Sequence, residues 1–127
     1  MAGERQRVVT EAIRRGQIWT ANLNPNRGRE LGKIRPVLIV QADWLSAAQS
    51  RAVVVLPLTS HVRRDAEPLR VTVHARGGLR TESQVVVEQP RTLDRRRLGE
   101  GPLTELSVDE MARVDASLLA VLGVFVA

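Results

Sequence analysis

The sequence has no cysteine, few aromatic residues and only two histidines. The absence of cysteine excludes disulfides, thiolate chemistry and cysteine-ligated metals. The histidines are far apart in the chain, so the sequence does not favour a zinc site, and we expect no metal and no cofactor. The aromatic residues are Trp19, Trp44 and Phe125. A domain that holds single strands by stacking bases on several rings would need more of them.

Long apolar runs are also missing. None approaches the roughly 18 residues of a membrane span, and the N-terminus lacks the apolar core of a signal peptide, so we expect a cytoplasmic protein without a membrane partner. A length of 127 residues suits one domain with one core. We expect residues 16–127 to form this domain, preceded by a loosely held basic arm, residues 1–15.

The net charge of +5 is unevenly distributed. Residues 1–41 contain eight Arg or Lys and three Asp or Glu, so they carry the whole excess, whereas residues 42–127 contain eleven of each sign. A concentrated basic region is typical of proteins that bind polyanions, nucleic acid above all. The alternative is a solubility surface in an arginine-rich protein, since 18 of the 19 basic residues are Arg.

Short runs of strand-forming residues predict a mainly β fold. Residues 17–23 alternate, with Ile18 on one face and Trp19, Ala21 and Leu23 on the other. Residues 37–40 and 52–58 are continuously apolar, which predicts strands buried on both faces and therefore covering layers or a closed barrel. Pro57 favours an edge or a bulge at the end of the second run. Further strands are expected at residues 69–74 and 83–88.

Two helices are expected. Asp43 can cap a short helix from Trp44 to about Gln49. Ser107 and Glu110 fit a capping box that starts an amphipathic helix, with apolar residues at helical spacing up to Leu122. Because residues 100–127 are net acidic, this helix is expected to lie away from the basic region. Residues 94–99 are expected to form a turn or short helix, and the run 95–97 is interpreted as a solvated basic face. The elements together predict a small, strongly bent antiparallel sheet or barrel.

The residues best suited to chemistry lie at two strand ends. Pro36 fixes its own φ and favours an extended Arg35, which places this arginine at a strand entrance. The strand at residues 52–58 is followed by the hydroxyl pair Thr59 and Ser60. We expect these strands to deliver Arg35 and Thr59 to a shared rim, which the glycine-containing loop at residues 27–34 can close over.

The motifs, in their order along the chain, resemble those of the MazF/PemK toxin family. The pattern is a strand followed by N-P, G-x-E and x-R-P-V-L-I-V-Q, then a strand ending P-L-T-S, then S-x-V-x-x-E-Q-x-R-T-L-D-x-x-R-L-G and a C-terminal helix, over about residues 16–123. The resemblance implies an SH3-like barrel that acts as a homodimer. It also implies a metal-independent endoribonuclease that cleaves single-stranded RNA to a 2′,3′-cyclic phosphate and a 5′-hydroxyl, and that is neutralised by a cognate antitoxin.

The resemblance also implies roles for individual residues. The catalytic arginine and threonine of the family fall on Arg35 and Thr59, and a loop glutamate proposed as a base falls on Glu30. The E-Q-x-R-T segment, which contributes to the RNA groove, falls on Glu88 to Thr92. The chain departs from the family pattern at Arg29, Lys33 and Pro90, which bears on sequence preference. The expected RNA-binding residues are Arg29, Lys33, Ser60, Gln89, Arg91 and Thr92.

These residues suit RNA cleavage by the 2′-hydroxyl. The Arg35 guanidinium can bind a phosphate with paired donors, and Thr59 can donate to a non-bridging oxygen. An arginine is a poor base because its pKa lies above about 12, so Glu30 is the better candidate. His61 is a second candidate base, although the family does not use a histidine there.

Two other functions stay open at this point. The same barrel could belong to a non-catalytic toxin that poisons a protein such as DNA gyrase, or to a domain that only binds nucleic acid. The combination of Arg35 before proline with a strand-end threonine favours cleavage, because a gyrase poison has no chemical need for it.

Overall fold

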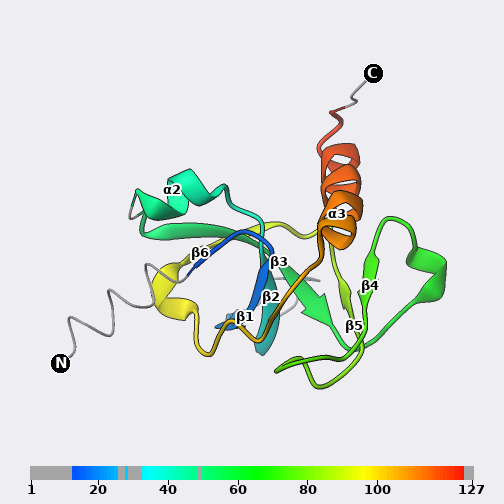
Figure 1. Cartoon of the computed structure of the whole chain (residues 1–127), viewed down its shortest axis with the longest axis horizontal. Coiled ribbons are helices and arrows are strands. Elements are labelled where there is room, and N and C mark those ends of the chain that lie inside the picture. Colours follow the sequence, from blue (N-terminus) through cyan, green and yellow to red (C-terminus); the bar gives the residue numbers. More distant parts are fainter. Residues whose placement is uncertain (1–12, 26–27, 29–32, 49, 125–127) are drawn as a thin grey trace.

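A curled antiparallel sheet and one long C-terminal helix make up most of the structure (Figure 1). The structure is a computed structural model that describes residues 13–25, 28, 33–48 and 50–124. The strands are β1 (Gln17–Asn22), β2 (Ile34–Ile39), β3 (Ala52–Thr59), β4 (Val71–Val73), β5 (Ser83–Val85), β6 (Arg91–Asp94) and β7 (Thr104–Glu105). The helices are α2 (Asp43–Ala47) and α3 (Val108–Val121), with 3₁₀ turns η1 (Arg64–Ala66) and η2 (Arg95–Arg97).

The strand order is β4-β5-β3-β2-β1-β7, and β6 also pairs with β3. Every pairing between these strands is antiparallel. The expectation of a mainly β, strongly bent antiparallel fold with a short helix after the second strand and a terminal helix is therefore confirmed. In the part of the chain that the structure describes, no helix is long and apolar enough to cross a membrane.

The central strands are buried on both faces, as their continuous apolar runs predict. On one face, Ile18, Leu38 and Leu56 belong to a cluster that α3 covers with Val114. On the other face, a second cluster contains Ile13, Trp19, Ala21, Leu23, Val37, Ile39, Val53, Val55, Leu93 and Leu98. The side chains alternate between these clusters along β1 and β2, so a strand-period pattern sets which residues point to each side.

Pro57 occupies a central strand, so its expected edge position is wrong. It pairs with Val37 of β2, and its carbonyl accepts a hydrogen bond from Val86 N–H at 2.9 Å on the other side. The N–H and C=O of a strand residue point to the same neighbouring strand. On this side of β3 the partner changes from β6, which ends opposite Val55, to β5, which begins opposite Leu58, so Pro57 lies where no N–H is needed. Proline fits there because that position lies between the two ladders.

The start of the described chain is held against the domain. Ile13 is buried in the second cluster, and Arg15 donates its N–H to Asp43 Oδ1 at 2.7 Å and forms an ion pair with Asp115. Residues 13–15 of the expected arm therefore pack on the domain, and residues 1–12 lie outside the described residues. Asp43 makes no cap for α2, whose N-cap is Ala42, because its carboxylate binds Arg15 instead.

Two expectations for residues 83–99 need correction. The strand expected at residues 83–88 ends at Val85, and β6 forms at Arg91–Asp94, where no strand was expected. The run 95–97 is not a solvated face: Arg95 is 8% exposed and donates to Ser46 O and Ser50 O, and burial lowers its pKa. Arg97 donates to Asn22 O at 3.2 Å at the end of β1. The guanidinium groups of Arg95 and Arg97 therefore donate hydrogen bonds to backbone carbonyls.

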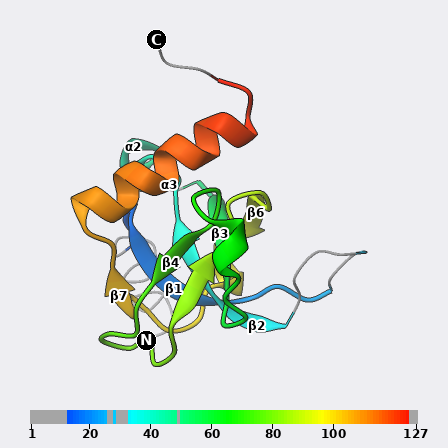
Figure 2. The same ribbon diagram turned by 90° about the vertical axis from the view of Figure 1, so that its right-hand side faces the viewer.

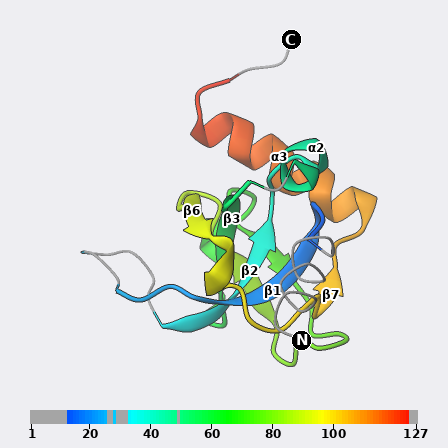
Figure 3. The ribbon, with the colours of Figure 1, turned by 90° about the vertical axis from the view of Figure 1, so that its left-hand side faces the viewer.

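Helix α3 begins with the predicted capping box, in which Glu110 N–H donates to Ser107 Oγ and Ser107 N–H donates to Glu110 Oε1. Only its middle packs on the sheet: Val114 is buried, whereas Val108 and Leu122 are 89% and 61% exposed. Figure 1 shows that the C-terminal end of α3 extends beyond the strands, which accounts for the exposure of Leu122. In Figures 2 and 3 the ends of β1 and β2 lie below α3 and project sideways from the sheet.

Candidate active site

Arg35 and Thr59 lie at the same end of two neighbouring strands. The β2–β3 ladder pairs Ile39 with Val55 and Val37 with Pro57, where it ends. Continuing this antiparallel register by two residues would bring Arg35 opposite Thr59, on one face of the sheet. On the other side, Arg35 pairs with Ala21 of β1. The two residues therefore stand at one end of the sheet, Arg35 second in β2 and Thr59 last in β3.

Thr59 is held by its own turn. Its side chain is 9% exposed, and Oγ1 accepts a hydrogen bond from His61 N–H at 3.1 Å. This bond uses a lone pair of the hydroxyl oxygen and leaves the O–H able to donate. The same bond fixes the backbone of His61, whose side chain is exposed. The turn thus presents a fixed hydroxyl donor at the end of β3.

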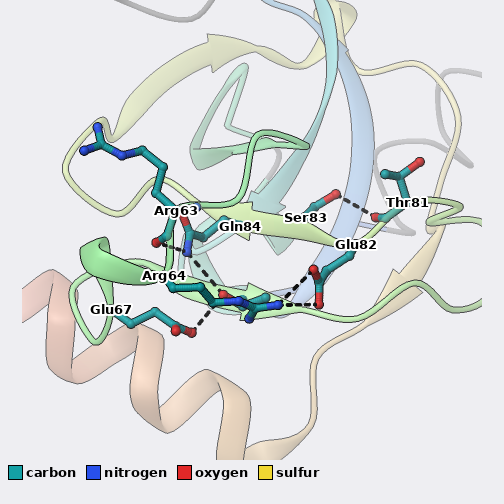
Figure 4. A network of polar contacts seen from close by, with 8 residues as sticks. Arg63, Arg64, Glu67, Thr81, Glu82, Ser83 and Gln84 are labelled. Atoms are coloured by element: carbon teal, nitrogen blue, oxygen red, sulfur yellow. Dashed lines mark hydrogen bonds and ion pairs between the residues drawn. The ribbon is translucent and has the colours of Figure 1, made fainter.

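A buried amide keeps the chain after Thr59 in place (Figure 4). Gln84, which pairs with Thr59 in the β3–β5 ladder, is fully buried. Its Oε1 accepts from Arg63 N–H at 3.2 Å, and its Nε2 donates to Arg63 O at 2.9 Å and to Thr72 Oγ1 at 3.2 Å. Arg64 forms an ion pair with Glu82 on the same side. These contacts fix the loop that follows Thr59, and with it the position of its hydroxyl.

Arg91 joins Arg35 and Thr59 on the same face. It pairs with Val55 of β3, and alternation places it on the side of the second cluster. Its Nη2 donates to Leu23 O at 3.3 Å, so the half-buried guanidinium reaches from β6 to the end of β1 where Arg35 lies. Guanidinium groups and a hydroxyl donor are the kinds of group that can bind a phosphodiester.

The other expected site residues are divided between places. Thr92 pairs with Val54 and is exposed on the opposite face from Arg91. Gln89 is half-buried in the turn before β6. Glu88 is bound by Arg70 Nη2 at 2.6 Å, and although burial alone would raise the pKa of Glu88, Arg70 lowers it on balance. Glu30 and Arg29 lie outside the described residues.

Lys33 and Ser60 line a cavity of about 460 Å³ beside this site. The cavity also includes Arg35 and Pro36, while its far wall comes from the β4–β5 hairpin and the segment before β7. Its lining residues are Thr20, Lys33, Ile34, Arg35, Pro36, Leu58, Ser60, Gly78, Leu79, Arg80, Thr81, Ser83, Glu100 and Leu103. Sequence reasoning missed Arg80 and Glu100. The available signals were their neighbouring glycines, Gly77-Gly78 and the pair at 99 and 101, which allow close backbone approach.

Comparison with known proteins places this fold and site in a family. Residues 14–122 match the family described as PemK-like, MazF-like toxins of type II toxin–antitoxin systems. The match spans most of the chain, and the chain belongs to this toxin family. The resemblance seen in the sequence motifs is therefore confirmed.

Solved structures show the same fold. MazF from Deinococcus radiodurans is 28% identical, with a TM-score of 0.72 over 87% of this chain and 96% of that chain. A MazE–MazF structure from the same organism is 26% identical, with a TM-score of 0.70 over 89% and 98%. An endoribonuclease from a mycobacterial species, in complex with its cognate antitoxin, is 23% identical, with a TM-score of 0.68 over 91% and 98%.

Proposed function

We propose that this protein is an endoribonuclease toxin that cleaves single-stranded RNA without a metal ion. The observation that supports this most is that Arg35 and Thr59 lie at the same end of β2 and β3, whose ladder register, continued by two residues, would bring them opposite each other. Membership of the toxin family and the likeness to a mycobacterial endoribonuclease agree with it. A gyrase poison on the same barrel would not need this pair, so cleavage is the preferred function.

The reaction follows from the groups at the sheet end. The 2′-oxygen of the substrate attacks the adjacent phosphorus, and the bond to the 5′-oxygen of the next nucleotide breaks. The 2′-proton passes to a base, for which we propose Glu30, and the leaving 5′-oxygen takes a proton from water. The products are a 2′,3′-cyclic phosphate and a 5′-hydroxyl. Arg35 and Thr59 stabilise the charge that develops on the non-bridging oxygens. Arg91, from the same face, binds the RNA backbone.

We further propose that the protein acts in the cytoplasm as a homodimer and is neutralised by a cognate antitoxin. The toxin family to which the chain belongs and the MazE–MazF neighbour support a protein antitoxin. A mass measurement by light scattering tests the dimer, and a mass equal to one chain would contradict it.

The central test is cleavage of a long single-stranded RNA in EDTA by the purified protein. We expect cleavage without added Mg²⁺, and a loss of at least about 10²–10³-fold in rate for Arg35→Ala and for Thr59→Val, because each removes a donor to the transition state. Arg96→Ala is the matched control, since Arg96 is exposed and paired only with Asp94. Circular dichroism melting shows whether the variants fold.

The chemistry has its own test. A substrate with deoxyribose at the scissile nucleotide lacks the nucleophile and is expected to bind but not to be cut. Cleavage of this substrate, or an absolute requirement for Mg²⁺, would refute the proposed mechanism. A protein that leaves RNA intact but inhibits supercoiling by gyrase would establish the alternative function.

A further inference from the structure

The cavity beside the active site has the contents of a binding site. Its wall includes Pro36, Leu58 and Ser60, which alternate with Arg35 and Thr59 along β2 and β3. Lys33 and Arg35 itself also line it, so the cavity begins at the sheet end that carries the candidate catalytic residues. Arg35 is therefore shared between the cavity and the proposed cleavage site.

Three of the four charged side chains that line the cavity are not used within the described fold, whereas the fourth, Arg35, has an interaction partner. In the described parts of the chain, the side chains of Lys33, Arg80 and Glu100 make no ion pair and no hydrogen bond. Elsewhere on the described surface, twelve charged side chains form six ion pairs, whereas others, such as Arg51 and Arg113, form none. Those pairs are Arg15–Asp115, Arg63–Asp65, Arg64–Glu82, Arg70–Glu88, Arg76–Glu110 and Arg96–Asp94. Two cations and a carboxylate that share one cavity without pairing are available to a ligand that offers both acceptors and donors.

Glu100 is held rigidly at the rim of the cavity. Its N–H donates to Thr20 Oγ1 at 2.7 Å, and its carbonyl accepts from Thr20 N–H at 2.8 Å. Glycines on both sides make this approach possible: a Cβ on Gly99 would lie 2.7 Å from Thr20 Oγ1, and one on Gly101 would lie 2.1 Å from the ring of Trp19. The backbone of Glu100 is thus clamped to β1, while its side chain is exposed.

The opposite wall is fixed as well. Gly78 N–H donates to Leu103 O at 2.7 Å, and a Cβ on Gly77 would lie 2.7 Å from the same carbonyl. Leu79, which pairs with Arg76 across the turn, is 3% exposed. Arg80 follows this anchored residue directly. Both ionic groups therefore extend from backbone that the fold holds in place, which lowers the entropy lost when a ligand binds.

The lining suits a nucleobase. Ile34, Pro36 and Leu103 supply apolar surface for a flat ring, and the hydroxyls of Ser60 and Thr81 supply further polar groups. Unpaired bases are read by hydrogen bonds on their Watson–Crick and Hoogsteen edges. A carboxylate can accept two parallel N–H bonds, and guanine is the RNA base with two adjacent donors, N1–H and the N2 amino group. Guanine also presents O6 and N7, the acceptor pair that arginine binds with two donors.

We propose that this cavity binds a guanine nucleotide next to the scissile phosphate and that Glu100 determines this preference. Glu100 accepts from guanine N1–H and N2–H, Arg80 donates to O6 and N7, and Lys33 binds the adjoining phosphate. The inference rests on the proposed RNA cleavage and adds the identity of one flanking base to it. Neither Glu100 nor Arg80 takes part in the chemical step.

The test uses oligoribonucleotides with one scissile nucleotide and each of the four bases at the three positions on either side of the cut. We expect the full-length protein to prefer guanine at one flanking position by about 10- to 100-fold, the discrimination of one well-formed bidentate contact. Glu100→Gln and Arg80→Gln should each lower this preference to within a few fold and leave the other positions unchanged. Glu82→Gln, which removes a carboxylate paired with Arg64 on the surface, is the control.

Inosine sharpens the result, because it lacks only the N2 amino group of guanine. The wild-type protein should cut the guanine substrate faster than the inosine substrate, and Glu100→Gln should cut both at similar rates. An unchanged base preference in both variants, or a preference altered at a base other than guanine, would overturn the inference while cleavage itself stands. Intact RNA with the wild-type protein would instead refute the proposed function.

Discussion

Two arginines of the β4–β5 hairpin, Arg76 and Arg80, have opposite environments. Arg76 binds Glu110 of α3 with Nη1 at 2.8 Å and Nη2 at 2.6 Å, and also donates to Glu105 O at 3.2 Å. Arg80 lies at the cavity, with no ion pair in the described part of the chain. The residue type and the hairpin are the same, so the difference comes from the partner that the fold brings to each position. One guanidinium is bound within the fold, and the other lines a cavity, where we propose that it binds a base.

The same contrast separates two sides of the molecule. On the α3 side, cations meet carboxylates: Arg15 meets Asp115, Arg70 meets Glu88 and Arg76 meets Glu110. At the projecting ends of β1 and β2, the nearby positive groups are held by backbone carbonyls or face the cavity, and Arg91 donates to Leu23 O. A carbonyl orients a guanidinium without neutralising it, in contrast to the carboxylates on the α3 side.

The largest expected effect is on stability, when Arg76 and Arg80 are each replaced by alanine in separate variants. Arg76→Ala should lower the free energy of unfolding by about 2–3 kcal/mol, because the Glu110 side chain, 11% exposed, loses its charged partner. Arg80→Ala should leave the unfolding midpoint in urea nearly unchanged and alter base preference instead. Urea unfolding followed by circular dichroism, together with cleavage rates per folded molecule, measures both.

This comparison fails if the two variants behave alike. A stable Arg76→Ala protein would mean that the ion pair with Glu110 contributes little, as many exposed pairs do. A strongly destabilised Arg80→Ala protein would mean that this side chain is part of the fold. Glu110→Gln serves as the reciprocal variant, because it removes the charge and keeps the shape of the side chain.

A smaller effect is expected from pH. Hydrogen bonding from Arg76 is the main reason that the pKa of Glu110 falls from its usual value of 4.5 to about 2. A carboxylate with a lowered pKa in the folded state adds stability above its unfolded pKa and loses it on protonation. The stability advantage of the wild type over Glu110→Gln should therefore be full above about pH 5 and shrink as the pH falls from 4.5 towards 2. An advantage that does not change with pH over this range would contradict the assignment.

The sequence was sufficient for elements that depend on local patterns. The alternation in residues 17–23 gave β1 with Ile18 and Trp19 on the predicted faces, and Ser107 with Glu110 gave the start of α3. The placement of Arg35 and Thr59 at the same end of neighbouring strands could be predicted because each lies at an end of a strongly apolar strand. The family motifs then supplied their proposed chemistry.

Features that depend on distant contacts could not be predicted. Pro57 looked like an edge residue because the sequence does not show that β3 changes partner there. Asp43 looked like a helix cap because its true partner, Arg15, precedes it by a whole hairpin. The cavity could not be predicted for the same reason. Its charged residues Arg80, Glu100 and Lys33 come from three separated segments, and only the tertiary fold brings them together.

The smallest expected effect concerns Lys33, whose backbone is fixed and whose side chain is not. Its N–H donates to Asn24 Oδ1 at 2.8 Å and its carbonyl accepts from Leu23 N–H at 2.8 Å, so a residue with φ of 70° joins the two strands at the base of the hairpin. The ammonium group lines the cavity, where we propose that it binds a phosphate.

Lys33→Gln should therefore weaken binding of a non-cleavable, 2′-deoxy-substituted RNA and reduce its dependence on salt. One phosphate contact on a single strand contributes about 0.7 to the slope of log K against log salt concentration, because one counterion fewer is released. Lys33→Arg should keep the slope, and Arg96→Gln, on the exposed surface of η2, should not change it. Fluorescence anisotropy over a range of NaCl concentrations measures these slopes. An unchanged slope in Lys33→Gln would show that the Lys33 ammonium group makes no contact with an RNA phosphate.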